Sequence, residues 1–77
     1  MIKKKDIIVL DDKLEYVVVD CLMYENNNYA YLCEMGNDNN VKFVQIEDDK
    51  NLSIIDTNEE KLLKKLILLF AKNSDNN

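Results

Sequence analysis

The chain has 77 residues, of which 47% are hydrophobic and 32% are charged, a composition typical of one folded domain and not of a disordered chain. Its net charge of −5 repels the phosphates of nucleic acids. The longest apolar run, residues 66–71, is far shorter than the roughly 20 residues of a membrane span. The apolar residues 7–10 are also too few for a secretory signal. We therefore expect a cytoplasmic protein that binds neither membranes nor nucleic acid.

The first predicted strand covers residues 7–10 and ends at a polar turn. Residues 14–24 form the strongest β segment, because β-branched and aromatic residues favour a pleated surface. Both alternating sets of this segment are largely apolar, with Asp20 as the polar member of one set. The strand is therefore predicted either to be central in the sheet or to carry a β-bulge near Asp20 that shifts its register.

Polar turns divide the next part of the chain. Two of them, at residues 25–28 and 36–40, are rich in asparagine, which tolerates a left-handed backbone. The third, at residues 47–51, is acidic. Three shorter β segments alternate with these turns, at residues 29–35, 41–46 and 52–55.

The C-terminal part of the chain predicts an amphipathic helix. Thr57 and Glu60 have the spacing of a capping box, in which the two residues satisfy free backbone N–H groups at the start of a helix. One broad face is apolar and should pack on the sheet: Leu62, Leu63, Leu66, Ile67, Leu69 and Phe70. The predicted fold class is α+β, an antiparallel meander sheet of four or five short strands packed against one C-terminal amphipathic helix. Residues 1–72 form this single domain, and residues 73–77 form a disordered polar tail.

No catalytic, cofactor or metal site is predicted. The chain has no histidine and one glycine, so it lacks the commonest general base and a Gly-rich phosphate loop. The acidic residues 47–49 and the polar residues 37–39 both fail as calcium loops, because neither contains the glycine of the sharp bend. Asp20 is the best candidate for a perturbed carboxylate, but we expect it to mark a bulge or to face solvent. A non-enzymatic protein without a cofactor is the prediction.

Cys21 and Cys33 form a candidate redox pair. If the loop of the first long hairpin has three residues, the two cysteines lie directly opposite each other, close enough for a strained disulfide. A four-residue loop shifts the register by one and abolishes that pairing. The simpler interpretation is two independent thiols in a reducing cytosol.

The outer face of the helix is the predicted protein-interaction surface. Leu68 falls opposite the apolar stripe, on the side that carries Lys61, Lys64, Lys65 and Lys72. A single exposed leucine needs no explanation. An apolar side chain surrounded by lysines is nevertheless a suitable contact for an acidic partner or for a second copy of the chain.

The order of these segments carries a family resemblance. An apolar strand precedes the segment YVVVDCLMY at residues 16–24, and a polar turn leads to YAYL at residues 29–32. Residues 41–46, the acidic residues 47–49 and a hydrophobic helix follow. This pattern, from about Asp6 to Ala71, resembles the YrzB-like family of small acidic bacterial proteins of unknown function, although this chain is richer in Asn and Lys and less acidic. The resemblance supports the fold and implies no chemistry.

Two functions are compatible with the sequence. The first is a small non-enzymatic interaction module that binds an unidentified protein, or a second copy in a homodimer, through the helix face or an exposed strand edge. The alternative is a phage or mobile-element inhibitor that blocks a host nucleic-acid enzyme through acidic surface charge. Small size, an acidic pI near 4.5 and abundant Asn and Lys, which are typical of AT-rich bacterial or phage genes, favour the alternative. Lysines that interrupt the acidic residues argue against it.

Overall fold

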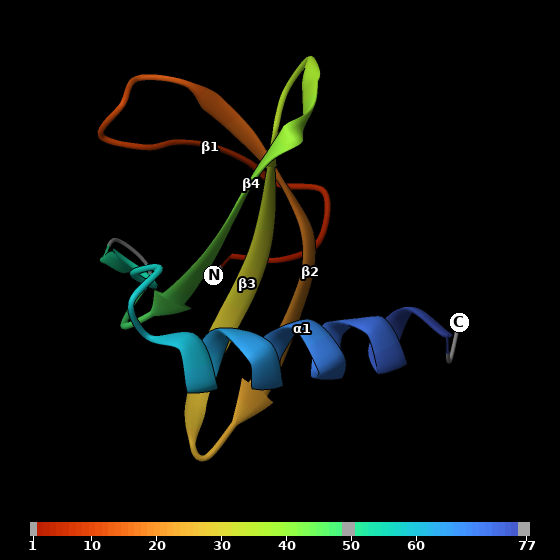
Figure 1. Ribbon diagram of the computed structural model, residues 1–77. Helices are drawn as coiled ribbons and strands as arrows, with labels where there is room; N and C mark the ends of the chain where they lie inside the picture. The colour runs from red at the N-terminus through yellow and green to blue at the C-terminus, as the bar shows by residue number, and fades with distance from the viewer. Residues whose placement is uncertain (1, 49–50, 76–77) are drawn as a thin grey trace.

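The structure, a computed structural model that describes residues 2–48 and 51–75, is one antiparallel sheet and one helix (Figure 1). The strands follow one another across the sheet in chain order, and the sheet curls into a half-barrel. This arrangement confirms the predicted α+β meander with a C-terminal helix. The elements of the described residues are β1 (Ile7–Val9), β2 (Glu15–Tyr24), β3 (Asn27–Glu34), β4 (Asn37–Ile46), β5 (Leu52–Ile54) and α1 (Glu60–Asp75).

A β-bulge divides β2 into two halves. The pairing with β3 shifts between Val18 and Asp20, so Val19 is an extra residue in the ladder. As a result, Tyr16 and Val18 point to one face of the sheet, whereas Leu22 points to the other. Both parts of the prediction for this strand are confirmed, because β2 lies between β1 and β3 and also carries the bulge.

Two hydrophobic clusters occupy the opposite faces of the sheet. Adjacent residues of β3 alternate between them, as the pleat requires: Ala30 belongs to the first and Tyr29 to the second. Strands alone supply the buried members of the first cluster, which are Tyr16, Val18, Ala30, Leu32 and Val44. The second cluster lies beneath α1, and its buried members are Tyr29, Ile55, Leu66 and Phe70. The helix is therefore needed to close only one of the two cores.

The turns are shorter than predicted. The β2–β3 turn consists of Glu25 and Asn26, whose φ angles of 50° and 66° match the two-residue hairpin turn that suits the twist of the strands. The β3–β4 turn consists of residues 35–36, and Gly36 supplies the left-handed φ of 83°. The prediction of a turn at residues 36–40 is wrong over residues 37–40, because they belong to β4, where a second shift of register absorbs them.

A reciprocal pair of side chain–backbone hydrogen bonds closes the turn before α1, one residue earlier than the predicted capping box. Asp56 Oδ1 accepts a hydrogen bond from the Asn58 backbone N at 3.3 Å, and Glu59 Oε2 accepts one from the Asp56 backbone N at 3.3 Å. This reciprocal pair has the pattern of a capping box, formed by Asp56 and Glu59 instead of Thr57 and Glu60, and it lies in the turn that leads into α1. Both pairs have the same spacing, so spacing alone does not distinguish them.

The residues of the predicted apolar face of α1 differ in burial. Leu66 and Phe70 are buried against the sheet, as predicted. The prediction that Ile67 packs on the sheet is wrong, because 52% of this residue is exposed. Within the described residues, no helix is both long and apolar enough to cross a membrane.

The last turn of α1 replaces the first part of the predicted tail. The helix continues to Asp75, so the prediction of a disordered tail is wrong for residues 73–75. Asn73 Nδ2 donates a hydrogen bond to Asp20 Oδ2 at 2.7 Å and ties this turn to β2. Residues 76–77 of the predicted tail lie outside the described residues.

The two leucines Leu66 and Leu68 should differ sharply in their contribution to stability. Leu66 is fully buried, so Leu66→Ala should lower the free energy of unfolding by about 2–5 kcal/mol. Leu68 is 60% exposed, so Leu68→Ala should change it by less than about 0.5 kcal/mol. Urea denaturation of both variants measures the difference, and equal losses would contradict the packing of α1.

Candidate functional site

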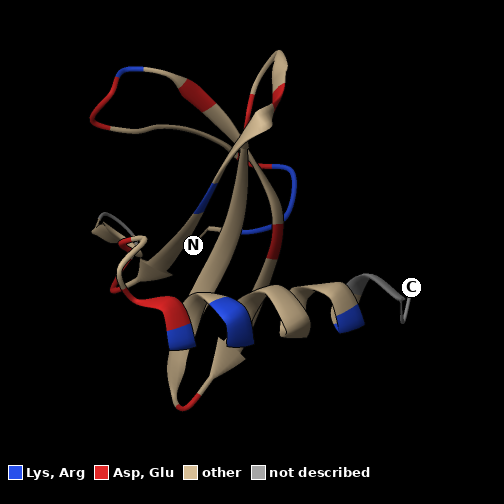
Figure 2. Cartoon of the chain, in the orientation of Figure 1, with Lys and Arg blue, Asp and Glu red and all other residues tan. Residues whose placement is uncertain are grey.

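The outer face of α1 carries the lysines and the exposed leucine that the sequence predicted. Leu68 is 60% exposed and lies within one helical turn of Lys64, Lys65 and Lys72. Lys61 begins the same basic side one turn earlier, and all four lysines are exposed (Figure 2). No ion pair joins these lysines to another part of the described chain. Their charge is therefore available to an external partner.

An apolar groove adjoins this lysine-rich face. It has a volume of about 500 Å³ and lies between α1 and the last two strands, β4 and β5. Ile67, which is exposed, connects the groove with Leu68, and Lys64 lies one turn before both residues. The apolar side chains of its lining are Val41, Phe43, Ile54, Ile55, Leu63 and Ile67.

Sequence reasoning missed this groove. Ile67 was assigned to the core because it shares a broad apolar stripe with Leu66. Val41 belongs to β4 and Ile54 to β5. The two residues line the same groove because these strands pair beside α1. Hydrophobic periodicity contains no information about which strand a helix residue faces, so no signal in the sequence predicts the groove.

The structure corrects the register on which the candidate redox pair depended. Cys21 lies opposite Ala30, and Cys33 lies opposite Val17. The two positions on β3 are three residues apart, or about 10 Å, whereas disulfides need Cα atoms within about 7 Å. The cause is the two-residue turn at Glu25 and Asn26, which replaces the three-residue loop of the prediction and places Cys21 opposite Ala30.

The environment of Cys21 also lowers the reactivity of its thiol. Both cysteines are free thiols, and Cys21 packs against the strand-only cluster near Ile2. Its Sγ donates a weak hydrogen bond to the Ile2 carbonyl oxygen at 3.9 Å. Burial raises the pKa of the Cys21 thiol, and the nearby Asp20 carboxylate raises it further. A raised pKa reduces the thiolate fraction that reacts with oxidants and electrophiles.

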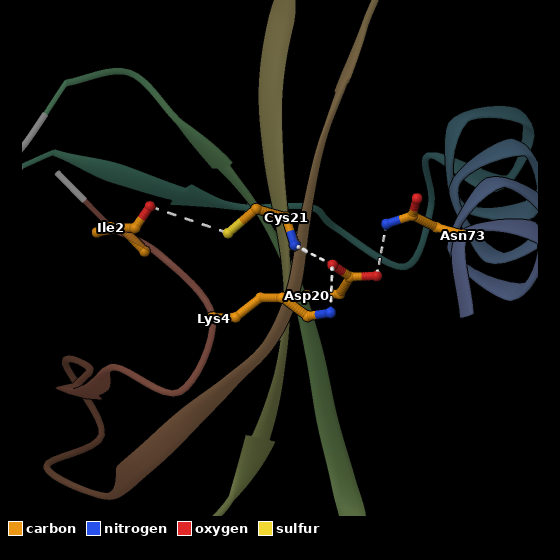
Figure 3. A network of polar contacts seen from close by, with 5 residues as sticks. All are labelled: Ile2, Lys4, Asp20, Cys21 and Asn73. Atoms are coloured by element: carbon orange, nitrogen blue, oxygen red, sulfur yellow. Dashed lines mark hydrogen bonds and ion pairs between the residues drawn. The ribbon is translucent and has the colours of Figure 1, made fainter. Parts of the chain in front are cut away.

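Asp20 is a buried junction between three parts of the chain (Figure 3). Only 5% of it is exposed, so the expectation that it faces solvent is wrong, while its place at the bulge is confirmed. Its Oδ1 accepts a hydrogen bond from the Cys21 backbone N at 2.9 Å, and its Oδ2 accepts the bond from Asn73. Lys4 Nζ lies 3.8 Å from Oδ1 and balances the charge. These contacts indicate a structural carboxylate that joins the N-terminal segment and α1 to β2.

A second polar network surrounds the hydroxyl of the buried Tyr16. The hydroxyl donates to Asp12 Oδ2 at 2.7 Å and accepts from Asn40 Nδ2 at 3.1 Å. Asn40 Nδ2 also donates to Glu34 Oε1 at 2.9 Å, and the Leu14 backbone N donates to Asp12 Oδ1 at 2.9 Å. The bond from Tyr16 lowers the pKa of Asp12, and the same bond raises the pKa of Tyr16. This network fixes the β1–β2 turn against the first cluster.

The described carboxylates of the acidic turn accept hydrogen bonds from nearby residues of the same chain. Glu47 Oε1 accepts a hydrogen bond from the Ser53 hydroxyl, and Asp48 accepts two from Asn51, at 2.9 and 2.7 Å. Residue 49 of the same stretch lies outside the described residues. Over residues 2–48 and 51–75, no three His, Cys, Asp or Glu side chains gather closely enough to hold a metal ion.

No family model, curated protein or solved structure matches this chain. The resemblance to the YrzB-like family therefore stays a prediction, and any function must be argued from the geometry of the surface.

The register predicts that both cysteines stay reduced. After mild oxidation of the folded protein, a thiol titration in denaturant should find two free thiols per chain, because the sulfur atoms cannot meet. Cys21→Ser and Cys33→Ser, which should each show one thiol, calibrate the titration. An intramolecular disulfide in the folded wild type would contradict the observed register.

The Tyr16–Asp12 hydrogen bond predicts part of the pH dependence of stability. Because the folded-state pKa of Asp12 lies below its ordinary 3.8, the stabilisation is present above that pH and is lost as the pH falls through the folded-state pKa. Urea midpoints measured from about pH 5 down to about pH 2 should fall less steeply for Asp12→Asn, which does not titrate. Tyr16→Phe should also flatten the slope, because it removes the largest cause of the shift. A wild-type slope in both variants would refute this assignment.

Proposed function

We propose that the protein is a small non-enzymatic interaction module that binds an acidic segment of another protein through the outer face of α1. The observation that carries this proposal is the pair Ile67 and Leu68, which are 52% and 60% exposed although they are neighbours in a helix whose other side is buried. Lys64 lies one helical turn before both residues, and Lys65 and Lys72 lie within one turn of Leu68. An apolar centre with a charged rim is the usual anatomy of a protein-binding surface.

The groove beside α1 supports an anchoring role for apolar side chains of the partner. Most binding energy in protein interfaces comes from a few side chains that fill central pockets. The groove offers Val41, Ile54 and Ile67 to one such side chain, while the lysines remain at its border. A partner segment with an apolar anchor followed by Asp or Glu therefore fits this surface best.

The charge of the partner follows from the local surface and not from the net charge of the chain. The whole protein carries −5, but α1 presents lysines on its outer side and acidic residues near its start (Figure 2). Exposed charges further apart than about 8–10 Å are largely screened at physiological salt, so a bound segment senses mainly the nearby lysines. Binding should therefore weaken as the salt concentration rises.

Variants of the α1 face test this function in a quantitative capture experiment. Tagged wild type, Leu68→Asp and Lys65→Glu are compared for the proteins that they retain from host lysate, and a photoreactive residue at position 68 identifies direct contacts. Leu68→Asp should reduce recovery of the partner about tenfold or more, the effect of losing a central contact worth about 1.4 kcal/mol or more. Lys65→Glu should reduce recovery most at low salt.

Met35→Asp provides the matched control. Met35 is 48% exposed in the β3–β4 turn, at the opposite end of the sheet from α1 (Figure 1). The Met35→Asp variant should retain the partner as well as wild type does. A partner recovered equally by wild type and Leu68→Asp, or lost equally in Met35→Asp, would refute the α1 face as the binding surface.

A further inference from the structure

The free edge of β1 presents backbone groups that no strand of the described chain pairs with. Val18 N donates to the Asp6 carbonyl oxygen at 2.8 Å, and Leu10 N donates to the Leu14 carbonyl oxygen at 3.2 Å. These bonds place alternate residues of the segment, including Ile8, in hydrogen-bonded pairs with β2.

Ile7 and Val9 occupy the remaining positions of β1. In the non-bonded pairs of an antiparallel ladder, the N–H and C=O groups point away from the neighbouring strand. The backbone groups of Ile7 and Val9 therefore point outward, because β1 is the first strand of the sheet order. Their side chains are 54% and 63% exposed, so the edge is apolar as well as unpaired.

The charges around β1 are self-complementary. Lys5 precedes the strand and Asp11 follows it, whereas Lys4 and Asp12 are bonded to Asp20 and Tyr16 of their own chain. When two copies of this segment run antiparallel, Lys5 of each copy comes nearest to Asp11 of the other. With Ile8 at the centre, Ile7 of each copy lies opposite Val9 of the other copy, so the outward-pointing groups meet as hydrogen-bonded pairs. The backbone and the charges therefore select the same register.

We propose that two copies of the chain form a two-fold symmetric dimer by antiparallel pairing of their β1 strands. Such an interface is isologous, because each copy contributes the same segment. Pairing satisfies four outward N–H and C=O groups on each strand, covers Ile7 and Val9, and joins the two sheets into one. It uses none of the residues of the α1 face.

The other edge of the sheet is formed by β5. Glu47 and Asp48, which precede β5, accept hydrogen bonds from Ser53 and Asn51 of their own chain. These two carboxylates are therefore already bonded within the chain. An open cavity of about 410 Å³ separates Val9 and Leu10 of the first edge from Leu52 and Ile54 of β5. Within the described residues both edges are thus uncovered, and variants on β1 distinguish pairing through this strand from pairing through β5.

The small contact predicts a weak dimer. A three-residue edge buries much less than the roughly 1,600 Å² of a standard stable interface. The weight-average mass should therefore rise from 9.0 kDa toward twice that value as the concentration increases. Sedimentation equilibrium from about 10 μM to about 1 mM covers the range in which a weak dimer is half formed.

A proline tests the backbone pairing directly. Val9 N does not bond to β2, so Val9→Pro removes only an outward N–H and is compatible with an edge strand. This variant should remain monomeric at concentrations at which wild type dimerises. Val9→Thr keeps both the N–H and the β preference, so it should dimerise like wild type. Circular dichroism checks that both variants are folded.

A charge exchange tests the register. Lys5→Glu and Asp11→Lys each bring like charges together in a homodimer, so each variant alone should weaken dimerisation. An equimolar mixture should regain the dimer, because the new carboxylate at position 5 then meets the new ammonium at position 11. Lys65→Glu, which changes the net charge equally on α1, should leave dimerisation unchanged.

Four results would overturn the proposal. These are a monomeric wild type at the highest concentration, a Val9→Pro variant that dimerises like wild type, a mixture of charge variants that stays monomeric, and loss of the dimer in Lys65→Glu. The last result would place the interface on α1. The two proposals can fail separately. Leu68→Asp should lose partner binding and still dimerise, whereas Val9→Pro should lose the dimer.

Discussion

The extra residue Val19 reverses the side-chain directions in the second half of β2, so that one strand contributes to both hydrophobic clusters. Before the bulge, Tyr16 and Val18 enter the core formed by strands alone; after it, Leu22 enters the core beneath α1. Without the bulge, strict alternation would place these side chains on a single face and leave the opposite face poorer in apolar groups. The sheet therefore has two apolar faces at different places along its length.

The same bulge explains why a buried carboxylate is tolerated. Asp20 follows the extra residue and receives hydrogen bonds from the Cys21 backbone and from Asn73, with Lys4 nearby. A buried carboxylate without such partners would cost several kcal/mol, so its contacts select the positions of the N-terminal segment and the helix end. The junction holds α1 across the sheet, and the orientation of α1 decides which helix residues stay exposed.

The two apolar surfaces that we propose for binding differ in physical character. The proposed contact on α1 depends on the shape and charge of exposed side chains. The proposed contact on β1 depends mainly on backbone hydrogen bonds, with the flanking charges favouring one partner strand. A dimer through β1 would display two α1 faces, and two linked binding surfaces increase the avidity for a partner with repeated acidic segments.

The sequence by itself determined the α+β class, the order of the elements and the exposure of Leu68, and it offered the bulge near Asp20 as one of two alternatives for β2. Each of these follows from local periodicity and residue type, which a single chain displays directly. Only the tertiary structure decided the register that separates Cys21 from Cys33, the burial of Asp20 and the exposure of Ile67. These features depend on how many residues each turn and bulge absorbs and on where α1 crosses the sheet. One residue more or less in a turn reverses the faces of a strand, and such a change leaves no trace in composition or periodicity.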